Sequence, residues 1–352
     1  MTQILLIAIV VMIFIVIFQI AKASEYVSVL KGEEKARKQT NKINAFLLIS
    51  FLVLGLVGVW WCNEMFYGKT LFVQGAASEM GQKIDLMLYI TIAVTGVVFV
   101  ITQILLFWFA FKYQENDERK AFYFPHNTKL ELLWTTVPAI FLTVLVVFGL
   151  KYWFKITSDA PKDAVIVEVT GHQFAWDFRY PGADNILGKK NYKLTKGANS
   201  LGVDFNDQAS LDDIHVTGTM HIPVNRPVKL VINAQDVIHD VGLPHFRMKM
   251  DAVPGIPTTL WFTPIYTTEE MKVRTGNPNF VYEISCDQIC GKGHFSMRGM
   301  IIVESDADYK MWLSTQKSEY STLYPDKVPK SAATDSSAAK QTPLAVVSVK
   351  GK

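Results

Sequence analysis

The sequence predicts two architectures in series: a membrane-embedded helical half followed by an all-β domain. Four long apolar stretches, none with a charged residue in its middle, occupy the first half of the 352-residue chain. Each is close to the ~20 residues that an apolar helix needs to cross a bilayer. From Val165 onward, apolar residues alternate with polar ones in short segments rich in β-branched and aromatic residues, which is typical of strands.

The apolar stretches predict four transmembrane helices, because four runs of this length are too many for the core of a soluble domain. They cover residues 4–20, 43–62, 86–111 and 132–153. No basic residue precedes the first stretch, so we expect a retained helix rather than a signal peptide, although AKAS follows it. Residues 1–62 are expected to form two additional helices joined by a basic connection, and residues 63–155 a helical hairpin.

Basic residues in the connections predict the orientation. Connection 21–42 carries six Lys or Arg residues, connection 63–85 carries two, and connection 112–131 carries four. Because cytoplasmic connections are enriched in Lys and Arg, the N-terminus is expected outside the cytoplasm and the first and third connections inside it. The fourth helix then leads the β domain to the outer side.

The second half predicts a β-sandwich or barrel in residues 156–307. Strand candidates lie at residues 165–169, 174–180, 228–233, 258–264, 280–285 and 300–305. The polar, Gly- and Asn-rich stretch 183–213 is expected to be a long loop. Residues 308–352 are expected to form a short amphipathic helix and a disordered tail, because Ser, Ala and Lys dominate the end of the chain.

Composition excludes several classes of function. The net charge is only +3, and no basic run is interleaved with aromatic residues, so a nucleic-acid partner is not expected. Three cysteines cannot form a disulfide framework. Cys62 ends an apolar stretch and is expected to be a small hydrophobic residue.

The segment SCDQICGKGHFSM, residues 285–297, combines Cys286, Cys290, His294 and Met297. A disulfide would leave the histidine and methionine unexplained. Zinc sites use cysteine, histidine or carboxylate rather than methionine, and redox dithiols usually have the spacing C-x-x-C. Thiolate, imidazole and thioether together favour copper.

Two thiolates suit two copper ions, since each sulfur can bridge both metals and spread the exchanged electron over them. A second imidazole must then come from elsewhere in the β domain. At this stage five histidines remain candidates: His172, His215, His221, His239 and His245.

Taken together, these residues resemble subunit II of the haem–copper cytochrome c oxidases. C-x-x-x-C-G-x-x-H-x-x-M is similar to the family's dinuclear copper A loop. Three other segments resemble the family in the same order: LELLWTTVPA at 130–139, GHQFAWDFRY at 171–180 and DVIHDVGLPHFRMKMDAVPG at 236–255. The resemblance covers about residues 86–305, and the first two helices lie outside the family's usual two-helix pattern.

The resemblance implies a cupredoxin-like Greek-key barrel and a ligand set for two copper ions. Cys286 and Cys290 would bridge both ions. His239 and Met297 would complete one ion, and His294 with the backbone carbonyl of Gln288 would complete the other.

Two positions depart from the family pattern. Gln288 stands where the family usually has a glutamate that also binds magnesium at the subunit I interface, and a neutral amide is a weaker ligand for a hard cation, which speaks against magnesium here. Phe174 stands where the family has the tryptophan through which electrons arrive, so Trp176 becomes the candidate for that role. Glu131 matches a family glutamate linked to the opening of a proton channel in subunit I.

The resemblance further implies an electron-transfer subunit of a proton-translocating terminal oxidase. Its partners would be subunits I and III, membrane lipid and a c-type cytochrome, with a respiratory supercomplex as an additional partner. Haems and dioxygen reduction would belong to subunit I. The two extra helices and the polar tail favour a bacterial cytoplasmic membrane over the mitochondrial inner membrane, with the copper domain in the periplasm. Two alternatives stay open: the copper A subunit of a nitric oxide reductase-type enzyme, and a membrane-anchored copper chaperone.

Overall fold

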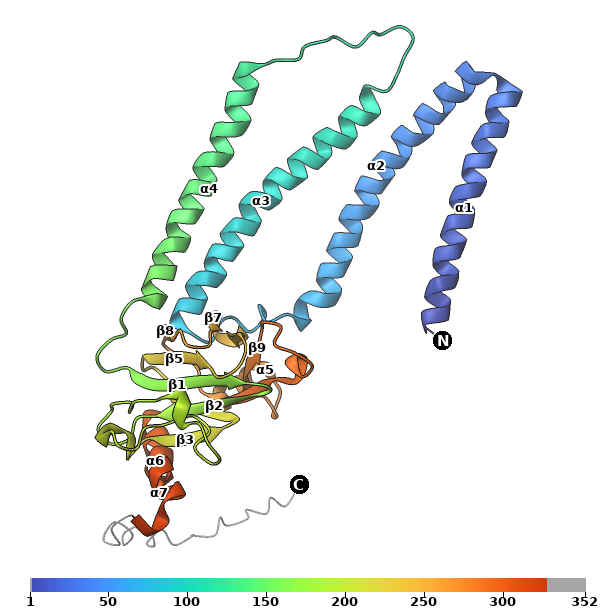
Figure 1. Cartoon of the computed structure of the whole chain (residues 1–352). Helices are drawn as coiled ribbons and strands as arrows, with labels where there is room; N and C mark the ends of the chain where they lie inside the picture. The colour runs from blue at the N-terminus through green and yellow to red at the C-terminus, as the bar shows by residue number, and fades with distance from the viewer. Residues whose placement is uncertain (1, 328–352) are drawn as a thin grey trace, which may run out of the picture. The chain divides into compact units, whose positions relative to one another are not determined.

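The computed structural model describes residues 2–327. The tail expected to be disordered begins at about Ser318, so its larger part, residues 328–352, lies outside the described residues. Four helices in the described part are long and apolar enough to cross a membrane, which confirms the four helices expected from the sequence (Figure 1). They are α1 (Thr2–Lys31), α2 (Glu33–Phe66), α3 (Glu79–Lys112) and α4 (Thr128–Thr157). Each helix extends beyond its apolar stretch, because polar residues at the ends continue the helical hydrogen bonds.

The basic connection between the first two helices is itself helical except at one residue. Gly32, with φ 83°, separates α1 from α2 in a left-handed conformation that glycine adopts without steric cost. Arg37 in α2 lies 3.4 Å from Glu115, and Lys38 pairs with Asp117, both in the connection that follows α3. These ion pairs join the two connections that the charge pattern assigns to the cytoplasmic side.

The chain divides into two compact units. One runs to Val73 and includes Leu88–Leu145; the other contains Gln74–Met87 and the chain from Val146 onward. The turns of α3 and α4 nearest the β domain thus pack with that domain. The domain boundaries expected from the sequence stay a prediction.

The β domain consists of two five-stranded sheets, which confirms the expected fold class. One has the order β3-β2-β1-β5-β8 and the other β4-β10-β9-β6-β7. In each sheet one pair is parallel, β1 with β5 and β4 with β10, which is the mark of long crossover connections. The strands are β1 (Val165–His172), β2 (Ala175–Tyr180), β3 (Ile214–Thr217), β4 (Thr219–Pro223), β5 (Val228–Ala234), β6 (His239–Leu243), β7 (Met248–Ala252), β8 (Thr258–Phe262), β9 (Tyr282–Cys286) and β10 (Arg298–Glu304).

Large apolar side chains from both sheets fill the space between them. Among the largest fully buried ones are Trp176, Phe178, Tyr180, Phe246 and Tyr282. Burying one such side chain contributes on the order of 2 kcal/mol, so this core holds the two sheets together.

Hydrogen bonds and an ion pair hold the start of α3 and the residues before it against the β domain. Ala77 N donates to the carbonyl of His245 over 2.8 Å, and Ser78 Oγ donates to that of Phe246 over 2.7 Å. Arg247 donates two hydrogen bonds to the Asp85 carboxylate, from Nε to Oδ1 over 2.8 Å and from Nη2 to Oδ2 over 3.2 Å. A planar fork on a carboxylate fixes orientation as well as distance, so the start of α3 is held rigidly against this domain.

The expected long loop 183–213 is largely irregular, and it is anchored by a buried ionic cluster. Arg179 lies 2.6 Å from Glu168 and 2.5 Å from Asp213, and it donates to the carbonyl of Gly188 over 2.9 Å. Burial raises the pKa of Asp213 to about 6 even though Arg179 opposes the shift.

Three short helices complete the domain: α5 (Thr268–Thr275), α6 (Asp306–Thr315) and α7 (Glu319–Leu323). The sequence indicated α6 but not α5, and the expectation of disorder from about Ser318 was wrong for α7, which Ser318 caps by accepting a hydrogen bond from Ser321 N. The Trp312 ring of α6 stacks on the His221 ring, with centroids 4.1 Å apart, which docks the helix on β4. The chain after β10 is therefore packed on the domain as far as α7.

Candidate metal centre

Neighbouring strands bring the predicted metal ligands together. His239 begins β6 and Cys286 ends β9, and these strands pair with Val241 opposite Cys286. The loop after β9 carries Cys290 and then a 3-10 turn that begins at His294. Cys286 N donates to the carbonyl of Met297 over 3.2 Å, which closes the loop at the start of β10.

The donor atoms form one cluster around the two sulfurs. The Sγ atoms of Cys286 and Cys290 lie 3.7 Å apart. His239 Nδ1 is 3.7 Å from the first sulfur, and His294 Nδ1 is 3.7 Å from the second. Met297 Sδ lies 3.9 Å from the sulfur of Cys290. The carbonyl of Gln288 lies 3.1 Å from the sulfur of Cys286. Each of the four other expected donors therefore lies within 3.9 Å of one of the two sulfurs.

The cluster is shielded from water. His239, Cys286, Cys290 and Met297 are buried, and His294 is half-buried. Burial, together with the neighbouring thiol of Cys286, raises the pKa of Cys290 to about 11. Both thiols must lose their protons to bind a metal, so we expect metal uptake to release protons and to strengthen as pH rises.

Asp236 orients the first histidine. Its Oδ1 lies 2.8 Å from His239 Nε2, so the ring presents Nδ1 to the sulfurs. Burial alone would raise the pKa of Asp236, but the hydrogen bonds from His239 and from two backbone N–H groups lower it. A carboxylate behind a metal-binding imidazole fixes the ring and raises its basicity.

The donor set fits copper rather than zinc or magnesium. Two thiols, two imidazoles and a thioether are soft or borderline ligands, and the oxygen present is a backbone carbonyl. Within the described residues, His239, Cys286 and Cys290 form the one group of three His, Cys, Asp or Glu residues whose ligand atoms all lie within 4.8 Å of one another.

Trp176 and Phe174 take different positions. Trp176 is fully buried, and its ring meets that of His239 edge-on with centroids 6.0 Å apart. Phe174 is 37% exposed and packs against Gly291 and Gly293 of the metal-binding loop. Trp176 therefore has no surface of its own for an electron donor, and its role as the point where electrons arrive stays a prediction.

Glu131 lies in the first turn of α4 and has a local partner. Its Oε1 accepts a hydrogen bond from Asn127 N at 3.3 Å, while the Asn127 side chain accepts one from Leu130 N at 3.1 Å. These reciprocal bonds cap the helix. Its role at a proton channel stays a prediction.

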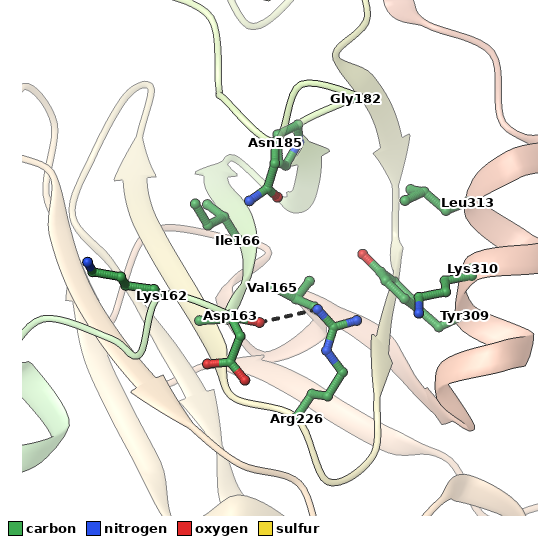
Figure 2. Close-up of a pocket in the computed structure, with 12 residues that line it drawn as sticks. Lys162, Asp163, Val165, Ile166, Gly182, Asn185, Arg226, Tyr309, Lys310 and Leu313 are labelled. Atoms are coloured by element: carbon green, nitrogen blue, oxygen red, sulfur yellow. Dashed lines mark hydrogen bonds between the residues drawn. The ribbon is translucent and has the colours of Figure 1, made fainter.

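A separate cavity of about 230 Å³ lies between the start of β1 and α6 (Figure 2). In it Arg226 donates to the carbonyl of Asp163 over 3.2 Å and also pairs with Asp306. No cysteine or histidine is among its lining residues, so this cavity is unrelated to the metal centre.

Sequence reasoning missed Gln173 and Asp236, which surround the centre without binding metal. Asp236 precedes His239 by three residues, and that spacing is the one available signal. Gln173 contacts the loop from the β1–β2 turn, and nothing in its local sequence marks it.

Comparisons with known proteins show the family to which the chain belongs. The model of the cytochrome c oxidase subunit II periplasmic domain matches residues 165–305, and that of the subunit II transmembrane domain matches residues 67–152. The alternative cytochrome c oxidase subunit 2 of Bradyrhizobium diazoefficiens is 34% identical over 272 residues, which cover 77% of this chain and 89% of that protein. Subunit 2 of Cereibacter sphaeroides is 28% identical over 251 residues, covering 68% and 78%.

Among solved structures, the periplasmic domain of subunit II of cytochrome oxidase from Bradyrhizobium japonicum aligns with 45% of this chain and 96% of its own, at 26% identity and a TM-score of 0.31. The sequence matches carry the assignment, since they span the membrane hairpin and the β domain in the observed order. The chain belongs to the cytochrome c oxidase subunit II family and is a membrane subunit of cytochrome c oxidase with a periplasmic domain.

Proposed function

We propose that the chain is the electron-accepting subunit of a bacterial respiratory oxidase. In this role a copper pair takes electrons one at a time from a c-type cytochrome and gives them to a haem of subunit I, where dioxygen is reduced with proton translocation. The observation that carries the proposal is the convergence of two imidazole nitrogens, a thioether sulfur and a backbone carbonyl around two cysteine sulfurs 3.7 Å apart.

The chain's own residues would hold copper as the family resemblance implies. Cys286 and Cys290 would bridge the ions, His239 and Met297 would bind one, and His294 with the Gln288 carbonyl would bind the other. Cys286 ends β9 and Met297 directly precedes β10, and both side chains belong to the buried core. Such support limits movement of the ligands when charge changes, which suits electron transfer.

The membrane helices and the orientation support the rest of the assignment. The charge pattern favours a copper domain on the periplasmic side, and the two added helices and the polar tail favour the bacterial cytoplasmic membrane. Subunits I and III would cover parts of the helical half. The N-terminal pair α1 and α2 precedes the segment matched by the family's transmembrane model, so it would contact an accessory subunit or a supercomplex partner, or serve as an added anchor.

Of the two alternatives, the copper chaperone is disfavoured by the fold. Its cysteines would lie ahead of a helix in a thioredoxin-like α/β domain, whereas here Cys286 ends β9 and Cys290 follows it in an all-β domain. A nitric oxide reductase-type complex would hold the same copper site. Purifying the complex and comparing its consumption of oxygen and of nitric oxide tests this: nitric oxide consumption without oxygen consumption would overturn the oxidase proposal.

Gln288 provides a separate test for magnesium. Its backbone carbonyl lies 3.1 Å from the Cys286 sulfur, while its neutral side chain is a weak partner for a hard cation. We expect the purified complex to bind Mg²⁺ weakly and Gln288→Glu to raise the bound Mg²⁺. Equal Mg²⁺ content in both proteins would show that this side chain does not limit binding.

A further inference from the structure

We propose that Gln173 is a positioning residue that sets the shape of the copper-binding loop from outside it. The proposal rests on the copper role proposed above and concerns how the loop is held. Gln173 lies in the turn between β1 and β2, and its side chain is not itself among the expected metal ligands.

The first contact is a hydrogen bond to the backbone of a ligand residue. Gln173 Nε2 donates to the carbonyl of Cys290 over 2.6 Å, in a partly buried position. In the described part of the chain, no other side chain from outside the loop donates to the backbone of residues 288–293. This one amide therefore supports the loop at the cysteine whose sulfur touches three other donors: Cys286, His294 and Met297.

The second contact of Gln173 is with Asp236, the carboxylate that orients the ligand His239. Gln173 N donates to Asp236 Oδ2 over 2.8 Å, and Oδ1 of the same carboxylate binds His239 Nε2 at 2.8 Å. The side chain of Gln173 thus holds Cys290, while its backbone holds the carboxylate that orients His239. One residue couples the histidine segment to the cysteine loop.

Packing shows that the loop is seated directly on this turn. A Cβ atom at Gly291, where φ is +133°, would lie 2.9 Å from Gln173 Nε2, and one at Gly293 would lie 2.6 Å from the Phe174 ring. Real Cβ atoms do not approach other atoms so closely. Both glycines therefore bring the loop backbone against Gln173 and Phe174 with no side chain between them.

Loss of the hydrogen bond would let Cys290 move relative to His239. Outer partners of metal ligands tune the metal and typically change its affinity by about 10–100-fold when they are removed. We expect a shifted reduction potential, an altered copper spectrum and copper loss to a chelator that is faster by roughly 10-fold.

The experiment uses the full chain in its purified complex and compares three variants. Gln173→Met keeps the length of the side chain and removes the donor, whereas Gln173→Ala removes both. Gln235→Ala is the matched control, because Gln235 Nε2 also donates to a backbone carbonyl, that of Ser200 over 2.9 Å, away from the loop. The readouts are the potential from redox titration, the paramagnetic spectrum, and the rate of copper loss.

A second readout does not need copper. In the metal-free protein, the alkylation rate of Cys286 and Cys290 reports how firmly the loop is closed, and we expect it to rise in both Gln173 variants. Absence of copper from the wild-type chain would refute the proposed function, while the alkylation rates would still test the loop. The inference is overturned if Gln173→Met matches the wild type in potential, spectrum, copper retention and alkylation, or if Gln235→Ala changes them equally.

Discussion

His215 should make the docking of α7 depend on pH. Its Nε2 lies 3.1 Å from Asp177 and its Nδ1 lies 3.5 Å from Glu319, both of which are buried carboxylates. Burial alone would lower the pKa of His215, but the two carboxylates outweigh it and raise the pKa from 6.5 to about 9. The backbone also holds α7 in place, since Glu319 N donates to the carbonyl of Asp213 over 2.8 Å. If His215 became neutral, the Glu319 carboxylate would stay buried and would lose the positive charge beside it.

The sign and size of the effect follow from the raised pKa. The charged histidine stabilises the folded state fully below pH 6.5, and this contribution is lost as pH rises through about 9. The difference between these two values corresponds to about 3 kcal/mol. Between them, the free energy of unfolding should therefore fall by about 1.4 kcal/mol per pH unit from this group alone.

Amide hydrogen exchange of β3 and α7 in the full chain measures this stability at several pH values. We expect His215→Gln to weaken protection at pH 6 by about 3 kcal/mol and to match the wild type near pH 10. Glu319→Gln removes one of the two carboxylates that raise the pKa of His215, so this variant should lose its protection at a lower pH than the wild type does. An equal pH slope in wild type and His215→Gln would refute the assignment of the shift to His215.

Two further predictions concern the packing of the β domain and of the copper loop. Arg179→Met should destabilise the domain by about 3–5 kcal/mol, because it leaves the buried carboxylate of Asp213 without its Arg179 partner and leaves Glu168 with Lys190 as its remaining cation. Heat unfolding checks this, and a loss below 1 kcal/mol would contradict it. Gly293→Ala should reduce copper content because its new methyl group meets the Phe174 ring, and combining it with Phe174→Ala should restore copper; failure of that rescue would show that the clash lies elsewhere.

Much of the fold could be predicted because its signals are local. The four membrane helices follow from the length of the apolar stretches. Alternation located β1, β2, β5, β8, β9 and β10. The strand β6 was missed because all five of its residues are buried, so no alternation marks it. In β2, alternation of apolar and polar residues predicts one buried and one exposed face. Both faces are in fact covered, because Asp177 and Arg179 on the polar face are buried in ion pairs.

The site was predictable only in part, for a related reason. The spacing of Cys286, Cys290, His294 and Met297 indicated copper without any structure. The choice of His239 among five histidines needed the family resemblance, because the local sequence of β6 and of β9 does not predict that these strands pair. The depth of Trp176 and the bond from Gln173 depend on how the β1–β2 turn meets the loop, which only the folded chain determines.

The most direct test of the account is the copper content and paramagnetic spectrum of the purified full chain, compared with Cys290→Ser. The two sulfurs and their four neighbouring donors predict two copper ions per wild-type chain, with the many-line spectrum of an electron shared between two nuclei. Cys290→Ser should lose that spectrum, because one bridging sulfur is gone. Zinc in the wild type, or a spectrum of a single copper ion that survives Cys290→Ser, would contradict the central claim.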